Sequence, residues 1–522
     1  MIDWLVRNAL IIDGLGNPAF KGDIAIRGDL ISGVGILGDM RAKNVIEAKG
    51  KIAAPGFIDM HSHSDVLYLN GSSLPHKVYQ GVTTELIGQD GISISPVTEA
   101  SKKHLKELIE PLSGTLEYAW KPWDVEESFQ KVVEKEPQLN VMSLVGHCNL
   151  RLAVMGHKMN APSPDEQDRM GDLLAESLKQ GAVGLSLGLI YPPSSYSETS
   201  ELISLAEVVK EHGGIVVVHI RNEQEGQFEA IEEMVTVGRE TGCPIHISHL
   251  KCSGKRNWGK MPRVLERLEQ ALEQGIDISF DQYPYTASCT SLSILLPGWA
   301  VEGGWERFRD RLNNSQTRES ILPSLTQSIE GRGGAPSIVI ASVQSEENQG
   351  LVGKNLEDIS RERGVTPEEA TLQLLVEEKM QLVAIYHALW EEDVECAMGH
   401  SLHTVGSDGI LAEFPHPRTY GTFPRIINHF CRKKGLFPLE EAIRKMTSAP
   451  AKRLNLEGRG RIESGAYADV ILFDPEHFRD KASYENPKQF ASGLDWVFVN
   501  GKPLLRNGDV QNIHPGHLIR KN

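Results

Sequence analysis

The sequence predicts an α/β protein: a (β/α)8 TIM-like barrel, a small β-sandwich domain built from both termini, and a lid insertion. Three observations predict this fold. Both ends of the chain are rich in short strand-like runs. The middle alternates apolar runs with helical periods over about 350 residues. One connection in the middle is about 120 residues long, far longer than a plain crossover.

The two ends of the chain have the same strand-like texture. Short apolar runs lie at 4–6, 9–12, 23–26 and 30–34, and again at 468–473 and 496–499. Turn dipeptides rich in glycine separate several of them. We therefore expect residues 1–54 and 455–522 to form the β-sandwich domain together.

Eight apolar runs in the middle of the chain predict successive parallel strands. They lie at 56–59, 83–88, 141–145, 183–187, 215–218, 244–247, 276–280 and 404–406. Helical periods lie between them, for example at 166–180, 200–212, 225–241 and 261–274. Strands that alternate with helices favour a parallel sheet, so we expect residues 55–454 to form the barrel.

The long connection between the seventh and eighth runs predicts the insertion. It contains a strand-like run at 337–340 and helical periods near 354–363 and 367–378. We expect a lid over the barrel mouth at about 286–350 that helps to choose the substrate side chain. Its first stretch is apolar and carries no Arg or Lys between Tyr285 and Trp299. This favours apolar or neutral side chains over glutamate and aspartate.

The composition of the chain indicates which kinds of partner it binds and in which compartment we expect it. The 522 residues carry a formal net charge of −16, which argues against nucleic acid and anionic membrane as partners. No apolar run reaches the roughly 18 residues of a transmembrane helix. The chain starts with an acid, Asp3, where a signal peptide has basic residues. The six cysteines form no C-x-x-C pair and indicate reduced thiols, so we expect a cytoplasmic protein.

Polar side chains follow the strand-like runs in a regular way. They are His61 and His63 after the first run, Asp90 after the second, His219 and His249 at the fifth and sixth, and Asp408 at the eighth. The carboxyl ends of barrel strands converge on one site. Any one of these histidines alone is better explained as a structural residue, but the joint pattern predicts a divalent metal with nitrogen and oxygen ligands.

Other polar residues follow the third and seventh runs. His147 follows the third run, and we interpret it as a metal or substrate contact, although hydrogen bonding to the backbone explains it equally well. Tyr283 and Tyr285 end the seventh run on the same face of the barrel.

The sequence resembles the amidohydrolase superfamily and, within it, the N-acyl-D-amino-acid deacylases. The superfamily resemblance lies in PGFIDMHSH at 55–63. The narrower one lies in GQDGIS at 88–93, GLSLGL at 184–189 with YPP at 191–193, HISHLK at 246–251, DQYPYTA at 281–287, GSDG at 406–409, and HPR at 416–418 with YGTFPR at 420–425. It covers essentially the whole chain and implies a barrel, a β-sandwich from both termini and a lid.

The resemblance implies a ligand set. A tightly held zinc would use Asp90, His219 and His249, and a second, weaker site would use His61, His63 and Asp408. The chain departs from the family at Asp90, where the deacylases carry cysteine. A carboxylate is a harder ligand than a thiolate and can bridge two cations, so one or two ions remain open and Co²⁺ or Mn²⁺ could replace Zn²⁺.

The resemblance also implies the reaction, which is hydrolysis of N-acyl-D-amino acids to a carboxylic acid and a D-amino acid. Metal-activated water would attack the carbonyl, with Asp408 as general base and then acid. Lys251 and Arg418 match family positions that hold the α-carboxylate, with Tyr283 as a hydroxyl donor. We also assign Tyr191 and His147 to substrate binding. The D-preference rests on the resemblance alone.

The sequence leaves some alternative functions open and disfavours others. Another linear or cyclic amide hydrolase, of the dihydroorotase or hydantoinase kind, remains open, although the fourth run contains no lysine to be carbamylated. An inactive scaffold would have lost ligands that this chain keeps. No G-x-S-x-G motif is placed on a strand-to-helix turn, and no strand is followed by G-x-G-x-x-G. The expected partner is a small N-acyl amino acid, and the sequence allows a homo-oligomer.

Overall fold

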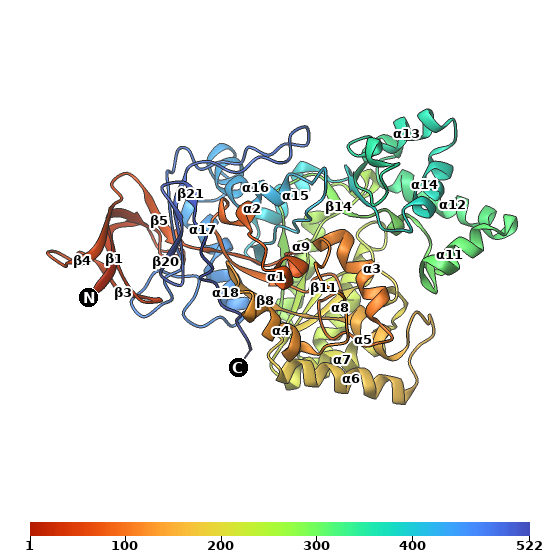
Figure 1. Cartoon of the computed structure of the whole chain (residues 1–522), viewed down its shortest axis with the longest axis horizontal. Coiled ribbons are helices and arrows are strands. Elements are labelled where there is room, and N and C mark those ends of the chain that lie inside the picture. The colour runs from red at the N-terminus through yellow and green to blue at the C-terminus, as the bar shows by residue number, and fades with distance from the viewer. Residues whose placement is uncertain (522) are drawn as a thin grey trace.

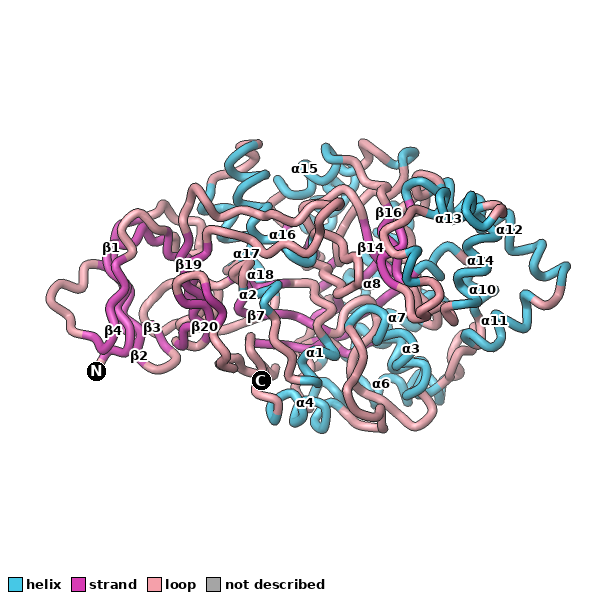
Figure 2. Tube along the Cα trace, turned by 45° about the horizontal axis from the view of Figure 1, so that its top comes forward, coloured by secondary structure: helices cyan, strands magenta, loops and turns pink. Residues whose placement is uncertain are grey.

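The computed structural model describes residues 1–521. The molecule is elongated, with a sheet built from both termini at one end, the barrel in the middle and the helical insertion at the other end (Figure 1). Figure 2 shows the strands of the terminal sheet and those of the insertion on opposite sides of the barrel.

The barrel strands follow one another in chain order and pair in parallel. They are β6 (Phe57–Asp59), β7 (Val82–Ile87), β8 (Asn140–Ser143) with β9 (Val145–Gly146), β10 (Gly184–Gly188), β11 (Ile215–His219), β12 (Ile245–Ile247), β13 (Ile278–Gln282) and β17 (His403–Val405). All their residues are buried, as expected for a sheet covered on both faces. The backbone N–H of Met60 donates to the carbonyl of Val405 at 3.1 Å and links the first strand to the last. The predicted barrel fold is confirmed.

Helices cover the outside of these strands. They are α1 (Asp65–Asn70), α3 (Lys102–Ser113), α4 (Val125–Glu134), α5 (His147–Val154), α6 (Pro164–Lys179), α7 (Thr199–Glu211), α8 (Gln227–Thr241), α9 (Met261–Glu273) and α15 (Glu391–Gly399). Residues next to the helix ends determine where these helices begin. Before α6, for example, Ser163 and Glu166 form a reciprocal capping box. In α9 the buried residues Val264, Leu268 and Ala271 form one apolar stripe that faces the barrel.

The terminal domain is a nine-stranded sheet with the order β21-β20-β19-β18-β5-β1-β2-β3, and β4 pairs with β1. Its strands are β1 (Ile2–Ile11), β2 (Phe20–Arg27), β3 (Leu30–Gly35), β4 (Ala42–Glu47), β5 (Ile52–Pro55), β18 (Val470–Phe473), β19 (Leu494–Val499), β20 (Lys502–Arg506) and β21 (Asp509–Val510). The antiparallel pairing of β5 with β18 joins the two ends of the chain. Helices α16 (Arg418–Arg425), α17 (Leu439–Met446) and α18 (Ser448–Arg453) lead into it from the barrel.

The insertion between β13 and β17 has its own core. It contains β14 (Ser288–Ser291), β15 (Ile338–Ser342), β16 (Val383–Tyr386), α10 (Gly298–Val301), α11 (Gly304–Leu312), α12 (Ser315–Gly331), α13 (Leu356–Arg363) and α14 (Pro367–Glu377). Strand β16 lies between β14 and β15 and pairs with both. The packed body therefore continues to Tyr386, beyond the end at about 350 expected from the sequence.

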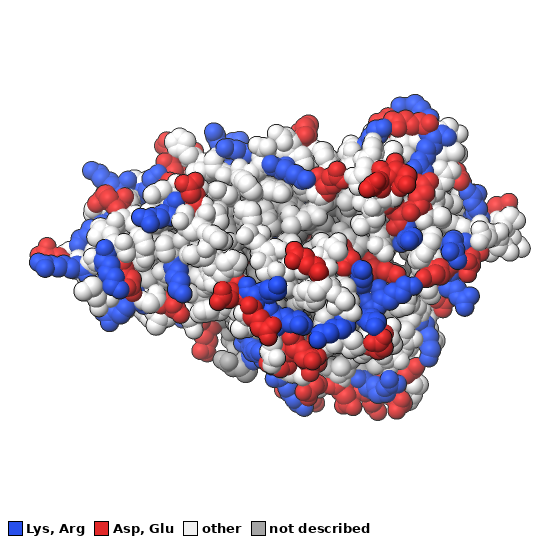
Figure 3. Space-filling model, viewed as in Figure 1, with Lys and Arg blue, Asp and Glu red and all other residues white. Residues whose placement is uncertain are grey.

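The surface carries charges of both signs. On the face shown in Figure 3, Lys and Arg side chains lie among Asp and Glu side chains. Among residues 1–521, no helix has both the length and the apolar character needed to cross a bilayer.

Candidate metal centre

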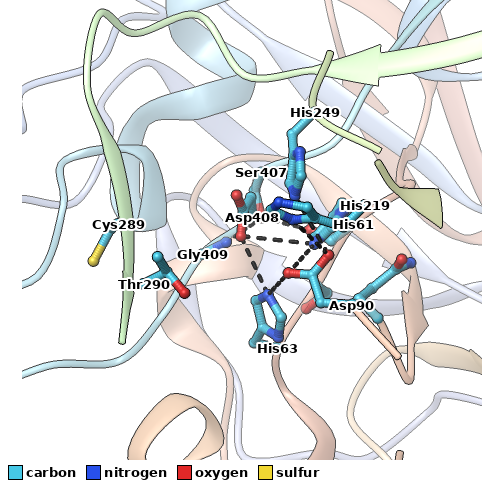
Figure 4. A network of polar contacts seen from close by, with 12 residues as sticks. His61, His63, Asp90, His219, His249, Cys289, Thr290, Ser407, Asp408 and Gly409 are labelled. Atoms are coloured by element: carbon cyan, nitrogen blue, oxygen red, sulfur yellow. Dashed lines mark hydrogen bonds and ion pairs between the residues drawn. The ribbon is translucent and has the colours of Figure 1, made fainter. Parts of the chain in front are cut away.

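Six side chains meet where the barrel strands end (Figure 4). His61 and His63 follow β6, Asp90 follows β7, His219 ends β11, His249 follows β12 and Asp408 follows β17. All six are at most 6 % exposed. The structure brings together the six residues of the ligand set that the resemblance implies, and they form two groups that share Asp90.

The first group surrounds His61 and His63. The Nε2 atom of His63 lies 3.5 Å from Asp90 Oδ2 and 3.2 Å from Asp408 Oδ1. The Nε2 atom of His61 lies 3.6 Å and 3.7 Å from the same two oxygens. Four potential ligand atoms thus face one point.

The second group uses the other oxygen of the same carboxylate. Asp90 Oδ1 lies 3.5 Å from His219 Nδ1 and 3.4 Å from His249 Nε2. Asp90 therefore presents one oxygen to each group, which is the arrangement of a bridging carboxylate.

These separations fit ligands around an ion. Two ligands bound at 2.0–2.1 Å on a tetrahedron lie about 3.3 Å apart, close to the distances above. Apart from the 3.2 Å contact between His63 and Asp408, these distances are longer than an ordinary hydrogen bond. Within residues 1–521, both ring nitrogens of His61 and of His219 and Asp90 Oδ1 are buried without a hydrogen-bond partner. Buried polar atoms are normally paired, so this donor set fits a divalent metal.

The backbone at three of these residues is strained. Asp90, His249 and Asp408 have φ angles of 55°, 36° and 49°, in a region that residues other than glycine rarely adopt. Residues held in this way cluster at functional sites, where the surrounding fold imposes the geometry. The strain aims the three side chains inward directly after their strands.

Arg418 pairs with the outer oxygen of Asp408. Its Nη1 lies 2.9 Å from Asp408 Oδ2, and its side chain is fully buried. Burial alone would raise the pKa of Asp408, but Arg418 and the nearby histidines outweigh burial and hold that pKa below its usual range. Burial would also raise the pKa of Asp90, but the surrounding histidines outweigh burial and lower that pKa.

Sequence reasoning missed Glu223, which lies in the loop after β11. Its Oε1 accepts a hydrogen bond from Lys251 Nζ at 2.5 Å and lies 3.3 Å from His249 Nδ1 and 3.6 Å from His219 Nε2. Burial would raise its pKa, but Lys251 and the two histidines lower it. The available sequence signal was the spacing of four residues from His219.

A buried ion cluster of Lys77, Asp59 and Glu85 supports the loops that carry the metal ligands. Lys77 Nζ lies 2.6 Å from Asp59 Oδ2 and 2.9 Å from Glu85 Oε1. Lys77 also donates to Ser407 Oγ at 2.9 Å, and Asp59 accepts from the backbone N–H groups of Ser407 and His61 at 2.8 and 3.2 Å. The cluster joins the loop that carries His61 to the loop that precedes Asp408.

The three residues expected to hold a carboxylate lie together. Arg418 stacks on the Tyr283 ring at 4.4 Å, and Lys251 lies 5.9 Å from the same ring. Within the described residues, Arg418 Nε and the Tyr283 hydroxyl are buried donors without an acceptor. Tyr191 lines the metal pocket with Lys251, with its hydroxyl 2.8 Å from Thr290 Oγ1 and its ring against His219.

The structure corrects the interpretation of His147. This residue is fully buried at the start of α5, and both ring nitrogens are used. Nδ1 lies 2.6 Å from Ser194 Oγ and Nε2 lies 2.8 Å from Glu201 Oε1. Because both nitrogens already have partners, His147 has no free ring nitrogen to offer a metal or a substrate, and it braces α5 against α7.

The lid places a cationic side chain at the site. This residue lies well beyond the apolar stretch before Trp299 on which the sequence prediction was based. Arg332, at the end of α12, lines the pocket over the metal ligands and donates to Ser328 Oγ at 2.9 Å. The expected preference for apolar or neutral substrate side chains stays a prediction.

Comparisons with known proteins agree with this geometry. An amidohydrolase family model matches residues 44–504. D-aminoacylase from Alcaligenes xylosoxydans xylosoxydans is 32% identical over 99% of this chain and 98% of its own length. N-acyl-D-glutamate deacylase from Bordetella bronchiseptica, solved with zinc and a phosphonate mimic of the tetrahedral intermediate, matches with 33% identity, a TM-score of 0.86 and full coverage of both chains. A D-aminoacylase structure, described as a binuclear centre with one-metal activation and second-metal attenuation, matches over both full chains with 32% identity and a TM-score of 0.86.

Proposed function

Because this chain belongs to the amidohydrolase family and matches D-aminoacylase over nearly its whole length, we propose that it hydrolyses N-acyl-D-amino acids to a carboxylic acid and a D-amino acid. The observation that carries the proposal is the Asp90 carboxylate, which faces two histidines with each of its oxygens. The preference for the D-enantiomer is supported by the relatives alone.

The residues that would hold the metal divide into two sets. Asp90, His219 and His249 would hold the tighter ion. A second ion would use His61, His63 and Asp408, with Asp90 shared between the sets. A divalent metal, zinc in the Bordetella bronchiseptica structure, makes water a better nucleophile and the amide carbonyl a better electrophile.

Asp408 is the residue placed to move the proton. Arg418 keeps its carboxylate ionised, so it can accept a proton from the attacking water. The same carboxyl group then returns the proton to the departing amine nitrogen, which would otherwise leave as an unstable anion. Arg418 also restrains the rotation of Asp408, because it binds the oxygen that faces away from His63.

Lys251, Tyr283 and Arg418 are placed to bind the substrate carboxylate. The unpaired donors on Arg418 and Tyr283 suit an anion, and a guanidinium matches a planar carboxylate well. Glu223 positions Lys251, since it accepts from the ammonium group and also lies beside the imidazole of His249. Tyr191 lines the same pocket as Lys251.

Two alternative chemistries find less support. The carbamylated-lysine bridge of hydantoinase-like enzymes needs a lysine on the fourth strand, and β10 reads GLSLG. That string also fits G-x-S-x-G, but it is a strand rather than a strand-to-helix turn. Ser186 Oγ accepts a hydrogen bond from the Gly91 N–H at 2.6 Å, so it has a structural role.

A paired enantiomer panel tests the proposal. Purified protein is assayed with the N-acetyl derivatives of D- and L-leucine, D- and L-phenylalanine, and D- and L-glutamate, in parallel with Asp408→Asn. Hydrolysis of the D-series that is lost in the variant supports the proposal. Hydrolysis of the L-series alone, or equal turnover by the variant, contradicts it.

We also propose that the protein acts in the cytoplasm on a small-molecule substrate. The six cysteines support this, since none forms a disulfide. A homo-oligomer stays a prediction.

A further inference from the structure

A large apolar hollow lies beside the metal pocket, between the lid and the barrel. Its volume is about 610 Å³, whereas the pocket over the metal ligands has about 100 Å³. Leu108, Pro111 and Leu112 of α3 line it, together with Trp299 and Trp305 of the lid. Three cationic residues, Arg221, Arg332 and Lys379, also belong to its lining.

The hollow is continuous with the metal pocket. Tyr191 and Thr290, whose side chains are hydrogen-bonded to each other, line both spaces. Leu112, Ile294, Arg221 and Arg332 also line both. A substrate whose amide lies over the metal ligands can therefore extend into the hollow without crossing a protein wall.

Of the three residues placed to bind the carboxylate, only Lys251 lines the metal pocket, and Lys251 does not line the hollow. Tyr283 and Arg418 are fully buried and line neither space. The hollow therefore accepts a part of the substrate that lies away from Lys251. Its volume falls in the range of about 300–1,000 Å³ that holds a whole drug-sized ligand, more than one amino-acid side chain needs.

From this geometry, and resting on the proposed hydrolase activity, we propose that the hollow is an acyl-chain subsite. The substrates are N-acyl-D-amino acids whose acyl group is a long, apolar chain. The carboxylate is held at Lys251, the amide lies at the metal ligands, and the chain lies between α3 and the lid. Tyr191 and Thr290 stand at the point where the chain leaves the metal pocket.

The proposal predicts a steep dependence on chain length. Each methylene that moves from water into an apolar site improves binding about threefold to fourfold. We expect kcat/KM for N-acyl-D-alanine to rise by at least about 100-fold from acetyl to decanoyl, since part of the hollow is open to solvent.

The experiment compares two substrate series. One series lengthens the acyl group on D-alanine through acetyl, butanoyl, hexanoyl, octanoyl and decanoyl. The other keeps acetyl and enlarges the side chain from D-alanine to D-leucine and D-phenylalanine. A steep rise in the first series alone supports the proposal. A flat first series overturns it, and a rise in the second series alone assigns the hollow to the side chain and overturns the acyl assignment.

Matched variants tie the effect to the hollow. Leu108→Asn and Trp299→Ala should each lower the ratio of decanoyl to acetyl kcat/KM by about tenfold, because they remove apolar wall. Val133→Asn, which changes an apolar residue exposed on α4 outside the hollow, is the control and should leave the ratio unchanged. Equal ratios in all three variants overturn the proposal. If no N-acyl-D-amino acid is hydrolysed at all, the proposed activity itself fails.

Discussion

Replacing Lys77 with methionine tests how strongly the metal loops depend on the charges buried beneath them. The Lys77 ammonium is fully buried and lies within 2.9 Å of both the Asp59 and the Glu85 carboxylates, which are also fully buried. Burial would lower the pKa of Lys77, but these two acids outweigh burial and raise it. The substitution keeps much of the side-chain volume and leaves two buried acids without their cation.

The expected loss is large. Removing one partner of a buried ion pair costs about 3–5 kcal/mol, because the remaining charge stays desolvated. Asp59 also holds the backbone N–H groups of His61 and Ser407. Disturbing such supporting contacts around metal ligands typically weakens metal binding about 10- to 100-fold.

Lys43→Met is the matched control. Lys43 pairs with Asp3 at 2.8 Å, but the two side chains are 57% and 31% exposed, so the expected cost is about 0–1 kcal/mol. Both variants are unfolded in urea at fixed zinc, and zinc affinity is measured by competition with a chelator. Equal shifts of the unfolding midpoint, or unchanged zinc affinity in Lys77→Met, would refute the reasoning.

Four further outcomes are expected. His219→Ala and His249→Ala should lose bound metal and activity together, and full metal stoichiometry in either would remove it from the ligand set. Asp408→Asn should keep the fold and most of the tighter metal while kcat falls about 100-fold or more, and near-normal turnover would exclude a proton-transfer role. Asp90→Cys should change the number of bound ions and the preference among Zn²⁺, Co²⁺ and Mn²⁺, whereas unchanged counts and preference would show that Asp90 is not a ligand. Burial lowers the pKa of His76 from 6.5 to about 3. Below about pH 6.5 the unfolded chain therefore binds a proton that the folded chain does not, and the stability should fall as the pH drops. His76→Leu should make the thermal midpoint less dependent on pH in this range, and an unchanged pH dependence would argue against this role of His76.

The metal ligands were predictable because strand order determines where they meet. Each ligand directly follows or ends a short apolar run, and parallel strands of a barrel deliver their carboxyl ends to one face. His219 and His249 needed only that rule. The opposed oxygens of Asp90 also follow from a position between the two histidine pairs.

Glu223 could not be predicted in the same way. It lies in a polar loop, close to Glu225, where a surface acid is the ordinary expectation. Its contact with Lys251 depends on how two neighbouring loops pack, which no local pattern encodes. His147 does follow the third strand, as the sequence indicates. The chain turns into α5 at that residue, however, and the turn directs the ring toward Glu201.

The end of the lid insertion could not be predicted from hydrophobic periodicity. The run at 337–340 and the helices near 354–363 and 367–378 were found from the sequence, and they correspond to β15, α13 and α14. The pairing of β14 with β16 joins residues 288–291 to 383–386. A pairing across so long an interval is set by packing rather than by local signals, so the end of the insertion was placed too early.

The central claim is that a metal centre bridged by Asp90 carries out the hydrolysis. It is tested most directly by stripping the protein with a chelator and titrating zinc back while turnover of N-acetyl-D-leucine is followed. The account predicts no turnover without metal and recovery within one to two zinc ions per chain, with N-acetyl-L-leucine not hydrolysed. Full turnover by the metal-free protein would contradict it. So would an Asp90→Ala variant that recovers turnover at the same zinc concentrations as the unmodified protein.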